Sequence, residues 1–166
     1  MNKKYKDFNL KGVFYLNFDV NFFDGEGTKE ERLQYLIDKG FEIGNHTYSH
    51  QLLDNASAKE IRMQIGKAQC ELEQYLPGYK MKTFALPGGR RVSKKKENLL
   101  LEGEYKGVTY KHEAIIYAAW RPTPAHFSKE YDNTHISRVE ATAKRRAYDQ
   151  VWWDENQEKA RLYVKN

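Results

Sequence analysis

Two histidines four residues apart are the side chains whose types and spacing most directly suggest chemistry. His46 and His50 close the segment 40–50 (GFEIGNHTYSH), in which the residues before them predict a short apolar strand. If the pair begins a helical turn, both imidazoles lie on one face of it. Two neutral imidazoles placed in this way form half of a common type of divalent-metal site. The alternative is a pair of polar loop residues that cap nearby backbone groups.

Other candidate ligands are few and scattered along the chain. Asp19 ends a predicted strand and is a candidate third ligand, the alternative being a carboxylate that meets solvent. His112 and His126 stand among polar residues, so we expect both on the surface. Cys70 is the single cysteine, which excludes an intrachain disulfide, and its helical context predicts a small buried apolar side chain.

Predicted strands and helices alternate along the chain. Capping boxes mark two helix starts, one formed by Thr28 and Glu31 and the other by Ser57 and Glu60. The predicted strands are 11–19, 41–43, 81–86 and 114–120, a further helix is predicted at 92–101, and a turn is predicted at 106–107. This alternation predicts an α/β fold with a mostly parallel sheet.

The candidate residues fall where such a fold binds ligands, beyond the carboxyl ends of its parallel strands. Asp19, the histidine pair and the glycine-rich segment Pro87–Gly89 all follow predicted strands directly. We therefore expect them to gather at one rim of the sheet. The tail has helical spacing over 144–158 and a possible last strand at 161–164. No linker or repeat appears, so we expect a single domain over residues 1–166.

Composition is that of an ordinary globular protein. The chain has 166 residues, of which 40% are hydrophobic and 31% charged, and its formal net charge is +5. Its basic runs, 94–96 and 144–146, lack interleaved aromatic residues, so we expect solvated helix faces and no nucleic-acid partner. No apolar run is long enough for a membrane span, and no apolar signal core follows the basic start, so no export signal is expected.

The segment GFEIGNHTYSH, its capped helix and the later TFALPGG together resemble the polysaccharide deacetylase family, whose catalytic unit is the NodB-homology domain. The resemblance extends over most of the chain. It implies a distorted β/α barrel that hydrolyses acetyl groups on N-acetylglucosamine polymers such as peptidoglycan or chitin, mostly at the cell envelope. It also implies a divalent metal, often zinc, held here by His46 and His50. The amide of Gly88 would face the oxyanion, and Tyr48, Pro87, Gly89 and Trp120 would contact the glycan substrate.

The chain departs from the family pattern at several points. No Thr-Phe-Asp-Asp element is present, so the family's first strand, with its catalytic base and third metal ligand, is expected to be missing from the amino end. Ala85 stands where the family has an arginine, and His135 is the remaining candidate for the late histidine that acts as general acid. We expect an incomplete barrel with weak or absent turnover.

Two functional classes follow from these departures. The first is a metal-dependent carbohydrate deacetylase, impaired in this chain. The second is a non-catalytic relative that binds a glycan or a protein. An opened barrel also leaves a strand edge unpaired, which predicts self-association through that edge.

Overall fold

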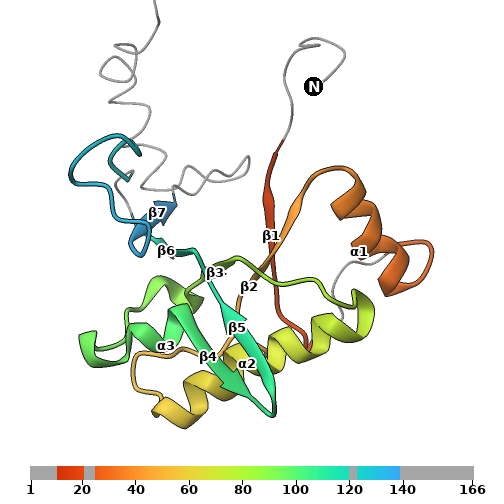
Figure 1. Cartoon of the computed structure of the whole chain (residues 1–166), viewed down its shortest axis with the longest axis horizontal. Helices are drawn as coiled ribbons and strands as arrows, with labels where there is room; N and C mark the ends of the chain where they lie inside the picture. The colour runs from red at the N-terminus through yellow and green to blue at the C-terminus, as the bar shows by residue number, and fades with distance from the viewer. Residues whose placement is uncertain (1–10, 21–24, 120–122, 139–166) are drawn as a thin grey trace, which may run out of the picture.

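The computed structural model describes residues 11–20, 25–119 and 123–138, and within them it forms a mixed α/β fold built on a parallel sheet (Figure 1). The sheet has the strand order β1-β2-β3-β6-β7, and all its neighbouring pairs are parallel. Its strands are β1 (Val13–Leu16), β2 (Glu42–Asn45), β3 (Thr83–Ala85), β6 (Ala114–Ala118) and β7 (Ile136–Arg138). The predicted fold class, an incomplete β/α barrel, is confirmed.

Both predicted helix starts are confirmed, and each helix begins at its capping box. Helix α1 (Lys29–Asp38) follows Thr28, whose hydroxyl accepts a 3.2 Å hydrogen bond from the amide of Glu31. Helix α2 (Ala58–Tyr75) follows Ser57, which accepts an equivalent bond of 3.2 Å from Glu60. In both boxes the glutamate carboxylate accepts a 2.7 Å bond from the cap residue's amide, so donors with no partner inside the helix are satisfied locally.

Helix α2 joins two clusters of buried side chains on one face of the sheet. Its Ala68 and Leu72 pack in a cluster with Ile43 of β2. Its Ile61 and Ile65 pack in a second cluster with Phe84 of β3. Because successive side chains of a strand point to opposite faces, the residues next to Ile43 and Phe84 face away from α2. The two faces of the sheet therefore offer two separate surfaces on which sites can form.

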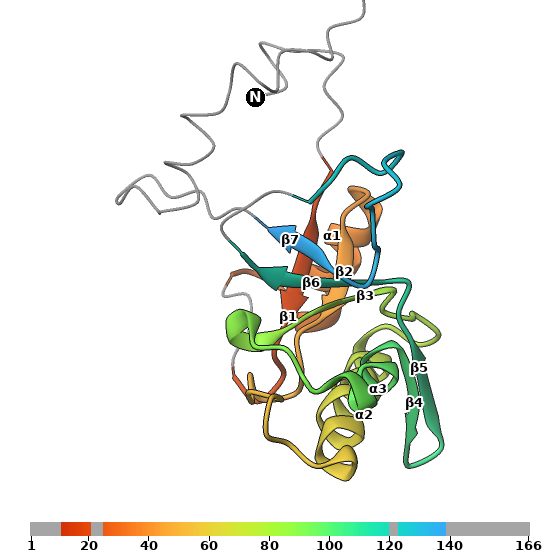
Figure 2. The ribbon, with the colours of Figure 1, turned by 90° about the vertical axis from the view of Figure 1, so that its left-hand side faces the viewer.

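The region after β3 differs from the prediction. The expected helix at 92–101 is broken into a 3₁₀ turn at Lys94–Lys96 and a short helix, α3 (Asn98–Leu101). A hairpin that was not predicted follows, made of β4 (Glu102–Tyr105) and β5 (Val108–Lys111) and lying beside α2 and α3 (Figure 2). Its turn is at the predicted place, with Lys106 and Gly107 both at positive φ.

The C-terminal part of the chain differs from the prediction or lies outside the described residues. The short strand β7 was not predicted, and the predicted elements at 144–158 and 161–164 lie outside the described residues. Strands β1 and β7 end the strand order of the described sheet, and self-association through such an edge stays a prediction. Within the described ranges, no helix combines the length and the apolar character needed to cross a bilayer.

Candidate functional site

The two histidines meet at the carboxyl end of β2, in a loop rather than in a helical turn. Thr47 and His50 have φ angles of 67° and 54°, which place both in the left-handed region and exclude a regular helix. The ring centroids of His46 and His50 are nevertheless 4.8 Å apart, with an interplanar angle of 74°. The helical turn considered from the spacing does not form, but the loop still brings the two imidazoles close together.

A buried asparagine shapes this loop. Asn45 is fully buried at the end of β2, and its side-chain oxygen accepts a 3.0 Å hydrogen bond from the amide of Thr47. Its side-chain nitrogen donates a 3.1 Å bond to the carbonyl of Ile65 in α2. The loop is thereby fixed to the helix at the residue before His46. Sequence reasoning did not single out Asn45, although a buried asparagine at a strand end commonly organises the following turn.

The other side of the loop is fixed by its main chain. The amide of Tyr48 donates a 2.9 Å hydrogen bond to the carbonyl of Gln64. The carbonyl of Tyr48 accepts bonds of 2.8 and 3.1 Å from the amides of Phe18 and Asp19. These contacts bring the end of β1 to the end of β2, as the topology predicted. The side chain of Asn17, which was not singled out, also donates a 2.6 Å bond to the carbonyl of His46.

The ring of His46 is prepared for a role as an acceptor or ligand. Its Nδ1 lies 2.7 Å from the carbonyl oxygen of Ala85, so Nδ1 must carry the proton and donate it. Burial is the largest cause that lowers the pKa of His46, and the nearby His50 and Arg138 lower it further. The ring is therefore neutral at pH 7, and its Nε2 lone pair is available. A backbone carbonyl that fixes the tautomer is the usual second partner of a metal-bound histidine.

These residues fit part of a metal site. His46 and His50 offer two imidazoles in reach of one another. Within the part of the chain that the structure describes, no group of three His, Cys, Asp or Glu side chains could hold an ion. Asp19 is exposed beside the loop and does not complete such a group with the pair. The donors present thus fit two ligands of a divalent cation, one protein ligand short of ordinary zinc coordination.

The glycine-rich segment follows β3 as predicted and forms a 3₁₀ turn over Pro87–Gly89. Gly88 and Gly89 have φ angles of 62° and 64°, which glycine adopts without strain. The amide of Gly89 donates a 3.1 Å bond to the carbonyl of Leu86, so the amide of Gly88 remains the candidate oxyanion donor. Pro87 is buried, and Trp120 lies outside the described residues.

Replacing Gly89 with alanine is expected to destabilise the chain more than replacing Gly78. Both glycines have positive φ, so both substitutions add backbone strain of about 1–2 kcal/mol. A Cβ at Gly89 would lie 2.9 Å from the carbonyl oxygen of Ala118, whereas a Cβ at Gly78 would meet nothing within 4 Å. We expect this contact to cost about 1–3 kcal/mol more, measured by urea unfolding. Equal losses would contradict the close packing of the turn against β6.

Three other side chains that were considered from the sequence lie within the described residues. Tyr48 is half-buried, and the Lys67 ammonium lies 3.5 Å from the centroid of its ring, so one face of the ring is covered. His112 was expected on the surface, and this is wrong, because it is only 4% exposed. Its neighbours Lys111 and Glu113 are exposed, as the alternation of side chains along an extended segment requires. His126 is exposed, as predicted.

Polar residues that sequence reasoning missed lie on the same sheet face as His46. The Tyr15 hydroxyl donates a 3.0 Å bond to the hydroxyl of Thr83, which donates a 2.7 Å bond to the carboxylate of Glu42. Burial raises the pKa of Tyr15. Arg138, at the end of β7, is close enough for its charge to lower the pKa of both Tyr15 and His46. Nothing in the sequence indicated that Arg138 would lie near the site, because β7 is the last strand of the described sheet.

His135, the candidate general acid, does not join the histidine pair. It comes directly before Ile136, which pairs with Ile116, so extending the register by one residue places it beside Ile115, whose side chain packs in a buried cluster with residues of α2. His46 instead shares its face with Tyr15, at a ring-centroid distance of 6.3 Å. Residue alternation therefore places His135 on the opposite, helix-covered face. Among the described residues, neither His135 nor a carboxylate joins the histidine pair in a group that could hold a metal ion.

Solved structures with a similar fold include two deacetylases and an acetyl xylan esterase. A Streptococcus pyogenes deacetylase, PplD, solved with acetate, aligns with a TM-score of 0.61 and 14% identity over 91% of this chain and 60% of that protein. A family 4 acetyl xylan esterase from Clostridium thermocellum, solved with a cobalt ion, aligns with a TM-score of 0.51 and 20% identity over 97% of this chain and 75% of that one.

A third comparison involves the Bacillus cereus polysaccharide deacetylase BC0361, which has a TM-score of 0.59 and 16% identity over 90% of this chain and 44% of that protein. The chain thus spans less than two thirds of the length of PplD and of BC0361. At these identities the likeness shows the fold alone. A search of curated protein sequences finds no match.

The sequence itself identifies the family. A family model described as polysaccharide deacetylase matches residues 5–110, which include the histidine loop and the glycine-rich turn. This match covers more than half of the chain and agrees with the fold and with the resemblance carried by the histidine motif. The chain belongs to the polysaccharide deacetylase family.

Proposed function

We propose that this chain binds a divalent cation, with zinc as the first candidate, through His46 and His50 and hydrolyses acetyl groups on the amino sugars of a glycan such as peptidoglycan or chitin. The observation that carries the proposal is the fixed orientation of the His46 ring beside His50. Its Nδ1 is held by the Ala85 carbonyl at 2.7 Å, and the ring of His50 lies 4.8 Å away. Family membership supports the reaction class, and one relative of similar fold was solved with a cobalt ion.

Each residue of the site has a task in this proposal. A cation bound by the imidazoles would polarise the acetyl carbonyl and lower the pKa of a bound water. His46 keeps its Nε2 unprotonated through its bond to Ala85. The amide of Gly88 donates a hydrogen bond to the carbonyl oxygen as negative charge develops there. Tyr48, Pro87, Gly89 and Trp120 are proposed to contact the glycan, with Asp19 as a further candidate ligand.

A second candidate function is supported by one observation. The described residues contain no carboxylate that joins the two imidazoles in a metal-binding group. Without such a group, the base and the third ligand have no assigned residue. The chain would then be a non-catalytic relative that binds a glycan or a protein partner with the same rim of the sheet.

Calorimetric titration with zinc tests the metal proposal. We expect the native chain to bind one zinc ion and His46→Ala to bind roughly 100-fold more weakly, because one of two protein ligands is lost. His126→Ala is the matched control, since His126 is exposed and remote from the pair in sequence, and it should bind as the native chain does. Equal affinity in all three proteins, or no binding by the native chain, would remove the metal proposal.

Acetate release separates the two candidate functions. The zinc-loaded chain is incubated with N-acetylglucosamine oligosaccharides and with peptidoglycan, and free acetate is measured. Acetate release that is lost in His46→Ala supports the deacetylase. Zinc binding without acetate release from either substrate supports the non-catalytic candidate.

A further inference from the structure

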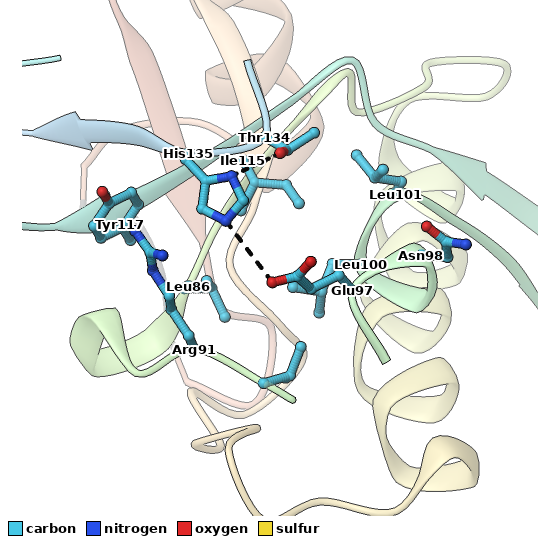
Figure 3. A pocket seen from close by; sticks show the side chains of 11 residues that line it. Leu86, Arg91, Glu97, Asn98, Leu100, Leu101, Ile115, Tyr117, Thr134 and His135 are labelled. Atoms are coloured by element: carbon cyan, nitrogen blue, oxygen red, sulfur yellow. Dashed lines mark hydrogen bonds and ion pairs between the residues drawn. The ribbon is translucent and has the colours of Figure 1, made fainter. Parts of the chain in front are cut away.

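A pocket lies on the helix-covered face of the sheet, away from the histidine pair. It has a volume of about 120 Å³, and the side chains of Leu86, Leu100 and Ile115 form its apolar floor. Figure 3 shows His135 at its edge, with Tyr117 and Arg91 on one side and Glu97 on the other. A cavity of this size is comparable with those that hold a single six-membered ring, about 150 Å³. It is too small for an oligosaccharide.

His135 is held in one orientation at the edge of this pocket. Its Nδ1 lies 2.6 Å from a carboxylate oxygen of Asp132, whose other oxygen accepts a 2.7 Å bond from the hydroxyl of Thr134. The hydrogen bonds from Thr134 lower the pKa of Asp132, so its carboxylate is charged and Nδ1–H donates to it. The preceding Asn133 anchors the segment, because its carbonyl accepts a 2.9 Å bond from the amide of Ile115.

This orientation leaves two acceptors facing each other across the pocket's edge. In the tautomer whose single proton lies on Nδ1, the Nε2 of His135 carries a lone pair, and it lies 3.8 Å from a carboxylate oxygen of Glu97. That separation is too long for a hydrogen bond. A donor nitrogen about 2.8 Å from both atoms would form a hydrogen bond with each of them. The side chains of His135 and Glu97 are 29% and 34% exposed, so such a donor can reach them from solvent.

The charges around the pocket favour a cationic donor. Glu97 and Asp132 contribute two carboxylates. The Arg91 guanidinium also lines the pocket, but it lies over the ring of Tyr117, 4.5 Å from its centroid. An ammonium group on a small ring would therefore place its charge between His135 and Glu97 and its apolar face on Leu100 and Ile115.

We propose that this pocket binds a single amino-sugar ring, with the ammonium group between Glu97 and the Nε2 of His135 and the ring over the apolar floor. An amino sugar is the ring that deacetylation of a glycan exposes, so the choice of ring rests on the proposed function. The pocket would then recognise glycan units that have already lost their acetyl group. The binding geometry itself does not involve His46 or His50.

Glucosamine is the probe for this site, with glucose as the matched ligand that carries a hydroxyl in place of the amine. We expect NMR titration of the full chain to show glucosamine binding with a Kd on the order of 1–10 mM, because the ring has only about a dozen heavy atoms. Glucose should bind at least about tenfold more weakly. Glu97→Gln, which removes the charge and keeps the shape, should weaken glucosamine binding about tenfold. Glu130→Gln, at an exposed residue outside the pocket lining, should have no effect.

Further variants separate this proposal from the metal proposal. Asp132→Asn changes an exposed side chain and should also weaken glucosamine binding, because it releases the tautomer of His135. His46→Ala should bind glucosamine as the native chain does, whatever its zinc affinity. Equal binding of glucose and glucosamine, or unchanged binding in both Glu97→Gln and Asp132→Asn, would overturn the amino-sugar site. A native chain that binds glucosamine but no zinc would overturn the metal proposal alone.

Discussion

Replacing Phe84 with alanine is expected to lower the free energy of unfolding by about 3–5 kcal/mol, the typical cost of removing a large buried aromatic side chain. Phe84 is fully buried at the centre of the cluster that joins β3 to α2. Its ring also stacks on that of His112, with centroids 5.4 Å apart, so the cavity would open between the sheet and the hairpin segment. Urea unfolding followed by circular dichroism measures the loss.

Phe84→Leu is the matched control for this experiment. It keeps most of the apolar volume, so we expect a loss of about 1.5 kcal/mol or less. Ala85 follows Phe84 and carries the carbonyl that holds His46, so Phe84→Ala should also weaken zinc binding if the proposed metal site exists. A loss below about 1 kcal/mol for Phe84→Ala would contradict the central position of this ring in the core.

Acidification from pH 7 to pH 4 is expected to remove about 3 kcal/mol of stability through His112 alone. Burial lowers the pKa of His112 from 6.5 to about 4, while its Nδ1 donates to the carbonyl of Leu100 at 2.5 Å. Between pH 6.5 and pH 4, His112 is protonated in the unfolded chain but stays neutral in the folded chain. The contribution is therefore complete above pH 6.5 and is lost as the pH falls toward 4.

His112→Asn separates this effect from the titration of carboxylates. Asparagine can replace the donating Nδ1–H but does not titrate, so the stability of the variant should fall less steeply between pH 6.5 and pH 4. Urea unfolding at half-unit pH steps gives both slopes. Identical slopes for the native chain and the variant would contradict the burial of a neutral His112.

The parts of the fold that local chemistry decides were predictable from the sequence. The capping boxes at Thr28 and Ser57 fixed two helix starts, because each box is complete within four residues. The apolar segments before the histidines and before Pro87 gave β2 and β3, which the structure places side by side. The convergence of the strand ends at one rim followed from the handedness and parallel order of such units.

The remaining features depend on contacts that are distant in sequence. The histidine loop owes its shape to Asn45 and to the Gln64 carbonyl of α2, so its left-handed residues had no local signal. His112 was misplaced because its charged neighbours were read as a polar surface, although alternation turns the middle residue of Lys-His-Glu inward. Arg138 belongs to β7, three strands away from the β2 end that carries His46, so no spacing along the chain reveals its influence on the pKa of His46.

Main-chain hydrogen bonds hold the histidine loop in its conformation, so the backbone path depends little on which side chains the loop carries. Three of them, from the amides of Phe18, Asp19 and Tyr48, involve no side chain at all. The loop is thus preorganised before anything binds, and a ligand would spend little conformational entropy in ordering it. The imidazoles could be exchanged for other side chains while the backbone kept its path. The same backbone can therefore support either a hydrolytic site or a surface that only binds, and a few side-chain substitutions would convert one into the other.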